Sequence, residues 1–209
     1  MRSRRSHVKA RPSASRRPRT QPPGVRRAQL MQAAEQLLLK RGIANTSVDD
    51  IVACADVAKG TFYLYFESKE ELLLALQHRF VADLCHRLEL AMSQPRTDDW
   101  HGRLRRWLES AVGGYFEAWG LHQVVFRDFR PSKRRKNDKN PIVEQLADFL
   151  REGHRAGAWS TEAPHSTARL LFHALHGAVE EALREQSKVN ARRLTRELEL
   201  FFRRVLSSV

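Results

Sequence analysis

The chain has 209 residues, of which 42% are hydrophobic, enough to build one or two compact domains. Its formal net charge of +13 favours a polyanionic partner, and the eight basic residues of segment 1–23, which has no acidic residue, contribute +8 of it. Two cysteines exclude a disulfide framework. The absence of an apolar run near the ~18 residues of a membrane span, and of an apolar N-terminal signal, predicts a cytoplasmic protein without a membrane partner.

Residues 1–23 mix arginine, serine and proline with almost nothing to bury. This composition predicts a disordered basic arm, because such a segment cannot offset its ordering entropy. The alternative is a solubilising tail or cloning remnant without a role on DNA.

Residues 24–69 carry the pattern of a helix-turn-helix domain. Apolar residues recur on one face of a helix over 25–41, which Gly42 ends. Ser47 and Asp50 form a variant capping box at the start of a second helix. A turn at Asp56 leads to a third helix near 59–66, with Phe62 facing the core.

Residues 70–209 predict a second, wholly helical domain. Ser68 caps a long helix whose stripe from Leu72 to Leu88 suggests a strut between the two domains. Because no segment alternates like a strand, the fold class is all-α. The further helical segments are 100–119, 121–129, 142–156, 167–186 and 189–206, with a basic loop over 130–140.

Residues 25–76 resemble the TetR family of bacterial transcription regulators. The resemblance rests on T-S-V-D-D-I-V from Thr46 and on V-A-K-G-T-F-Y-L-Y-F-E-S-K-E-E-L-L from Val57. Over 77–209 it is architectural only. It implies that the third helix enters the major groove of DNA.

The start of the third helix is expected to read bases, and its flanks to bind phosphates. Lys59 can donate to guanine, Thr61 offers a hydroxyl and a methyl group, and Gly60 allows close backbone approach. An alternative for Ser47 is that it only caps the helix, and an alternative for Tyr63 is that it lies in the core. The predicted DNA contacts are Ser47, Lys59, Gly60, Thr61, Tyr63, Leu64, Tyr65 and Lys69.

Two residues depart from the family pattern. Asp56 stands where glycine is usual, and Asp is among the few other residues that tolerate a left-handed backbone. Ala58 stands where a serine N-cap is common, so the third helix is expected to fray in the absence of DNA.

A single reading head covers one half-site, so we expect a homodimer on a near-palindromic double-stranded operator. The last two helices are predicted to form its interface as a four-helix bundle, the usual arrangement in the family. The alternative is that their stripes pack inside the monomer. The predicted interface residues are Leu171, Leu175, Ala178, Ala182, Leu194, Leu198, Phe201 and Val205.

The resemblance also implies a cavity for a small-molecule effector, and apolar walls would suit a hydrophobic or aromatic one. Gly113 and Gly114 leave room for it. His-x-x-His at 173–176 is too weak to predict a metal site, and no cofactor is expected. The predicted pocket residues are Trp107, Phe116, Trp119, His122, Phe126, Phe172 and His176.

The function predicted for the chain is a sequence-specific repressor released by its effector. No Gly-rich phosphate loop, nucleophile–base pair or persuasive carboxylate pair is present, so an enzyme is not expected. An architectural or low-specificity DNA-binding protein, driven by the arm and the basic loop, is the alternative.

Overall fold

The computed structural model describes residues 23–93, 98–129, 139–184 and 190–207. All regular structure in these ranges is helical, which confirms the predicted fold class. The predicted arm, except Pro23, and most of the basic loop lie outside them. The elements are α1 (Pro23–Arg41), α2 (Val48–Cys54), α3 (Lys59–Tyr63), α4 (Lys69–Met92), α5 (Trp100–Glu117), α6 (Trp119–His122), the π-helical η1 (Gln123–Asp128), α7 (Pro141–Arg155), α8 (Pro164–Arg184) and α9 (Ala191–Leu206).

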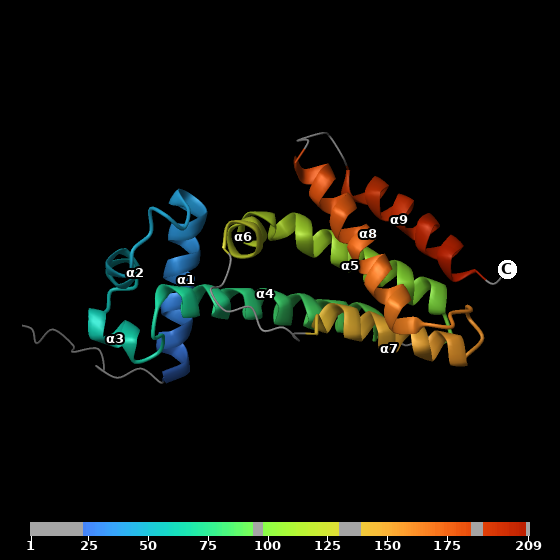
Figure 1. Ribbon diagram of the computed structural model, residues 1–209, viewed down its shortest axis with the longest axis horizontal. Coiled ribbons are helices and arrows are strands. Elements are labelled where there is room, and N and C mark those ends of the chain that lie inside the picture. Colours follow the sequence, from blue (N-terminus) through green and yellow to red (C-terminus); the bar gives the residue numbers. More distant parts are fainter. Residues whose placement is uncertain (1–22, 94–97, 130–138, 185–189, 208–209) are drawn as a thin grey trace, which may run out of the picture.

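Helix α4 joins the two ends of the molecule (Figure 1). Helices α1, α2 and α3 gather around its N-terminal end, and α5 and α7 pack along the remainder of its length. Helix α8 packs on α7 and α5, and α9 packs on α5. Its 24 residues correspond to roughly 36 Å at 1.5 Å per residue, about the span of a small domain. The strut expected from the sequence is therefore this helix.

Local signals set the helix ends in the N-terminal unit. Gly42 has φ +76°, a left-handed conformation that ends α1 at little cost because glycine has no Cβ. Ser47 and Asp50 cap α2 reciprocally, and the Ser68 hydroxyl accepts a hydrogen bond from the Glu71 N–H at the start of α4. These predicted caps are confirmed.

The turn between α2 and α3 has the two predicted irregularities. Asp56 has φ +52°, the one non-glycine residue with positive φ in the described ranges. Ala58 is the N-cap of α3 and supplies no side-chain hydrogen bond. Helix α3 has only five residues and ends at Tyr63, earlier than predicted, although Phe66 N–H still donates to the Phe62 carbonyl.

The core of the N-terminal unit extends beyond α1–α3. Leu72 and Leu76 of α4 lie in it, fully buried, and Val125 of η1 reaches it from far along the chain. The boundary expected after Lys69 thus falls within one continuous packed cluster. Its fully buried members include Leu30, Leu38, Ile51, Phe62 and Phe66.

The second core fills the space between α4, α5, α7, α8 and α9. Helix α5 continues through Gly113 and Gly114, and a Cβ on Gly114 would lie 2.8 Å from the Leu84 Cδ1 atom. Glycine therefore lets α5 approach α4 closely here. A Cβ on Gly113 would meet no atom within 4 Å, so the room expected from the glycine pair exists at Gly113 and not against Leu84.

This second core also takes up much of the predicted dimer interface. Five of the eight predicted residues are at most 8% exposed within the single chain, so they have little surface left for a second copy. An apolar stripe does not specify whether its partner lies in the same chain, and the interface stays a prediction. The five are Leu171, Leu175, Ala182, Leu194 and Leu198, whereas Ala178 is half-buried and Phe201 and Val205 are exposed.

The absence of a side-chain cap on α3 predicts that a capping residue would stabilise the protein. Ala58→Ser should raise the free energy of unfolding by about 1 kcal/mol, because the hydroxyl would accept a hydrogen bond from an unpaired N–H of α3. Urea denaturation of the full chain measures it. Ala53→Ser, on the exposed side of α2, is the control and should not stabilise. Equal stability of Ala58→Ser and the unmodified chain would contradict the prediction.

Candidate DNA-binding surface and a buried histidine pair

The outer side of α3 presents apolar and aromatic side chains to solvent. Leu64 is 79% exposed and Tyr63 53% exposed, so Tyr63 is not a core residue. Gly60 faces open space, with no atom within 4 Å of an added Cβ. Thr61 and Tyr65 are half-buried. Tyr63 at the end of α3 and Leu64 directly after it therefore leave adjacent apolar surface in contact with solvent.

Lys59, at the start of α3, is held by α2. Its Nζ atom lies 2.8 Å from Oδ1 of Asp49, and both side chains are largely exposed. The hydrogen bond from the ammonium to Asp49, together with the carboxylate charge, raises the pKa of Lys59. An exposed pair of this kind is weak, so the ammonium can exchange Asp49 for a stronger acceptor.

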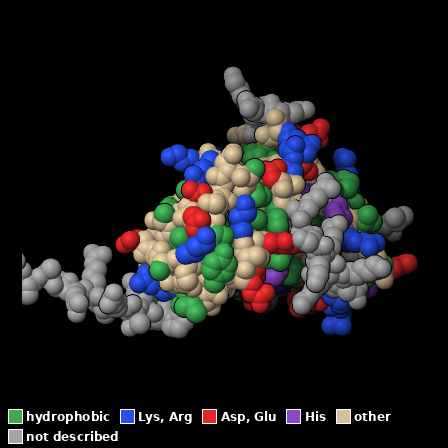
Figure 2. All heavy atoms as spheres, turned by 60° about the vertical axis from the view of Figure 1, so that its left-hand side comes forward, with side chains coloured by type: hydrophobic (Ala, Val, Ile, Leu, Met, Phe, Trp, Pro, Cys, Tyr) green, Lys and Arg blue, Asp and Glu red, His purple; other side chains and the backbone are tan. Residues whose placement is uncertain are grey.

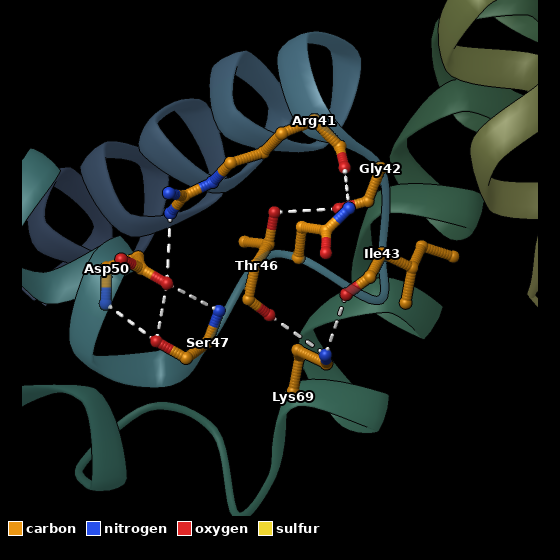
Figure 3. Close-up of polar contacts among 8 residues, drawn as sticks. Arg41, Gly42, Ile43, Thr46, Ser47, Asp50 and Lys69 are labelled. Atoms are coloured by element: carbon orange, nitrogen blue, oxygen red, sulfur yellow. Dashed lines mark hydrogen bonds and ion pairs between the residues drawn. The ribbon is translucent and has the colours of Figure 1, made fainter.

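Asp50 is the centre of a polar network at the start of α2 (Figure 3). Its carboxylate accepts hydrogen bonds from the Ser47 hydroxyl and N–H and lies 2.9 Å from the Arg41 Nη2 atom. The Ser47 hydrogen bonds, with a further contribution from Arg41, lower the pKa of Asp50 to about 2. Ser47 is therefore a cap, and its exposed position leaves it open to a phosphate as well.

Lys69 connects the start of α4 to the turn between α1 and α2. Its ammonium donates to the carbonyls of Ile43 at 3.0 Å and Thr46 at 2.9 Å (Figure 3). Thr46 is 1% exposed, and its hydroxyl donates to the Gly42 carbonyl. Two of the three ammonium donors are thus engaged within the protein, and one remains for a phosphate. From its position in the sequence, Lys69 was expected only to bind a phosphate.

Basic and acidic side chains are interspersed on the face turned forward in Figure 2. The described N-terminal unit, over 24–69, has six basic and five acidic residues, so its net charge is +1. A large non-specific attraction to phosphates does not arise from this unit itself.

Five of the seven predicted pocket residues come together. The His122 ring stacks on Trp119 and Phe126, with centroids 5.4 and 4.9 Å away, and lies 5.0 Å from the His176 ring. Phe172 lies 6.0 Å from His176. Trp107 instead packs on Phe202 in the core, and Phe116 lies at its edge.

Two residues outside the predicted set complete this cluster. Phe80 of α4 and Tyr115 of α5 lie 5.6 and 5.3 Å from the His122 ring. Phe80 belongs to the apolar stripe of α4 and was assigned to packing. Only the meeting of α4, α5, α6 and α8 reveals its second contact.

The two imidazoles form a buried pair. His122 is 7% exposed, and its Nε2 atom lies 3.1 Å from the Nε2 atom of His176. Such a contact is a hydrogen bond only when at least one ring is neutral. Burial, with a smaller contribution from His176, lowers the pKa of His122 to about 4, and burial also lowers the pKa of His176. Among the described residues, no third histidine, cysteine or carboxylate joins them to hold a metal.

Comparison with known proteins shows which regulators the helix-turn-helix segment resembles. Residues 30–76 match the model of the bacterial regulatory proteins of the tetR family. The HTH-type transcriptional regulator EthR of Mycobacterium tuberculosis is 36% identical over 98 residues, which are 47% of this chain and 44% of EthR.

Solved structures show that the fold of the rest of the chain is similar as well. A putative TetR-family transcriptional regulator from Syntrophomonas wolfei superposes with a TM-score of 0.73, at 18% identity, over 87% of this chain and 95% of that one. The chain thus resembles the TetR family in sequence over residues 30–76 and in fold over most of its length. The SmeT–triclosan complex has the same fold, with a TM-score of 0.67 at 20% identity, over 88% of this chain and 92% of SmeT.

The match over residues 30–76 confirms the resemblance found in the sequence. The curated relative is a transcriptional regulator, which agrees with the expectation that the chain is not an enzyme. Its alignment with this chain spans less than half of its length. None of the helices in the described ranges has the length and apolar character needed to cross a membrane.

The Lys69 contacts predict that replacing this lysine lowers the stability of the protein. Lys69→Met should lower the free energy of unfolding by about 1–3 kcal/mol, because the substitution leaves carbonyls at a half-buried site without donors. Chemical denaturation measures it, with Lys40→Met, exposed on α1, as the control. A phosphate role in addition would reduce the slope of log affinity for DNA against log salt by about 1. Unchanged stability would contradict the structural role.

The histidine pair predicts a pH dependence of stability. In the unfolded chain His122 protonates near its ordinary value of 6.5, and in the folded chain near 4, so the unfolded state binds the extra proton between these values. The free energy of unfolding should therefore hold above pH 6.5 and decrease by on the order of 2 kcal/mol as the pH falls to 4.

Thermal denaturation across this pH range measures the effect. His122→Phe should flatten the decrease between pH 6.5 and 4, whereas His78→Gln, exposed on α4, should leave it unchanged. The same slope in all three proteins would show that other groups cause it.

Proposed function

We propose that the chain is a DNA-binding transcription regulator that binds a near-palindromic operator as a homodimer and represses transcription until a small molecule releases it. The observation that carries the proposal is the exposed outer side of α3, presented by a capped and cross-braced helix-turn-helix. The resemblance to the TetR family supports the DNA-binding part. Operator occupancy by itself can block transcription, which is why we propose repression.

In this proposal Lys59, Gly60, Thr61 and Leu64 face the bases. Lys59 would leave Asp49 for guanine acceptors, and Leu64 would contact a thymine methyl group. Lys59 favours a guanine, and Leu64 favours a thymine methyl group. Together they would favour DNA sequences that present both groups in one major groove. The phosphate contacts would be Ser47, Tyr63, Tyr65 and the third donor of Lys69.

The homodimer would form through the outer faces of the last two helices. Apolar side chains remain exposed there: Leu170 at 68%, Leu200 at 55%, Phe201 at 46% and Val205 at 45%. Exposed apolar groups in one region favour association, since a partner would remove them from water. Phe201, Val205 and half-buried Ala178 are the predicted residues that this proposal keeps.

The effector would bind beside the histidine pair, where five predicted pocket residues converge. Aromatic faces and two largely neutral imidazoles suit a hydrophobic or aromatic molecule with a hydrogen-bonding group. The SmeT complex with triclosan has the same fold with a bound aromatic compound, which supports this class of effector.

Competition binding tests the proposal against the architectural alternative. The full chain should retain the DNA upstream of its own gene at physiological salt in the presence of excess non-specific DNA. Lys59→Ala should weaken that complex by about 1–3 kcal/mol and relax its specificity, because a base contact is lost. Electrophoretic mobility shift assays measure both effects.

The control is Lys40→Ala, exposed on α1 and outside the reading surface. It should reduce specific and non-specific affinity alike, or neither. Equal affinity of the unmodified chain for its upstream DNA and for non-specific DNA would establish the architectural alternative instead.

A further inference from the structure

A groove of about 550 Å³ lies where α4 passes α1, α5 and α6. Its walls come from both halves of the molecule, since Ala28 and Glu35 belong to α1 and Glu117 to α5. The groove is separate from the histidine pair, although Phe80 borders both: it lines the groove and contacts the His122 ring.

Three charged residues of α4 follow one another along the groove at intervals of four. Arg79 pairs with Glu35 of α1, and Arg87 pairs with Glu117 of α5 through a contact of 2.5 Å. Both arginine charges are therefore balanced within the protein, each by a carboxylate that also lines the groove. The Arg87 hydrogen bond lowers the pKa of Glu117, so this pair remains ionised.

Asp83, between the two arginines, has no such partner. In the described part of the chain its carboxylate takes part in no hydrogen bond or ion pair, and its side chain is exposed in the groove. The lining thus has three carboxylates and two guanidinium groups, a net charge of −1. This sign is opposite to that of the whole chain, whose net charge is +13.

The floor beneath these charges is apolar. Phe80 and Leu84 lie on α4 between the charged residues, and Ala118 and Leu121 close the far side. An aromatic face such as that of Phe80 attracts cations as well as apolar groups. A ligand with one positive charge and an apolar body would satisfy both the unpaired Asp83 and this floor.

We propose that the groove between α1, α4, α5 and α6 binds an organic monocation, with Asp83 as its counter-ion and Phe80 and Leu84 as its apolar contact. An anion would meet a local excess of carboxylates, and the cations that could bind it, Arg79 and Arg87, are already paired. The site goes beyond the proposed effector and operator functions, because its occupation requires neither.

Isothermal titration calorimetry of the full chain without DNA tests the site. The probe is tetraphenylphosphonium, and tetraphenylborate is its anionic counterpart of the same shape. Asp83→Asn should lower the affinity for tetraphenylphosphonium about fivefold and should not lower that for tetraphenylborate, because the lost carboxylate attracts only the cation. Glu89→Gln, also exposed on α4 but outside the groove, should leave both affinities unchanged.

Ala28→Trp supplies a second variant. Ala28 is exposed on the α1 wall, so an indole there fills the groove without entering a core and should abolish phosphonium binding. The proposal fails if the unmodified chain does not bind tetraphenylphosphonium, or if Asp83→Asn and Ala28→Trp bind it as the unmodified chain does. Because DNA is absent, none of these results depends on the proposed regulatory function.

Discussion

The packing of α4 into two separate cores is the constraint on which the rest of the structure depends. Leu72 and Leu76 complete the core of the helix-turn-helix unit, and Leu84 and Leu88 complete that of the C-terminal half. A three-helix unit of this size buries little apolar surface and is marginally stable by itself. The helix-turn-helix unit therefore shares a helix that belongs equally to the other half.

Polar contacts then fix the reading head on that helix. The Lys69 ammonium holds the carbonyls of the α1–α2 turn, and Asp50 gathers Ser47 and Arg41 at the start of α2. These bonds determine where α2 begins, and α2 in turn holds Lys59 through Asp49. A chain of short polar contacts thus leads from the first turn of α4 to the first residue of α3.

The local features of the fold were predictable from sequence because each depends on neighbouring residues. The capping box at Ser47, the left-handed Asp56 and the uncapped Ala58 all follow from local backbone chemistry. Likewise, apolar residues that recur at helical spacing predicted the bounds of every helix of four or more turns to within a few residues.

Contacts between distant segments were not predictable in this way. In α9 the step from Leu198 leads to Phe201 or to Phe202 with nearly equal helical periodicity, and the structure buries Phe202 completely while Phe201 stays 46% exposed. The partner of an apolar stripe is a property of the whole fold. The approach of His122 to His176, 54 residues away, belongs to the same class.

The stripe of α4 also determines how its two ends are turned. Its buried residues Leu72, Leu76, Phe80, Leu84 and Leu88 succeed one another at intervals of four. Each interval exceeds one helical turn by about 40°, so the stripe winds by roughly 160° between Leu72 and Leu88. The side of α4 that enters the first core is consequently turned by about 100° from the side that enters the second. Because one helix belongs to both cores, a rotation of α4 about its own axis would alter the packing of both at once.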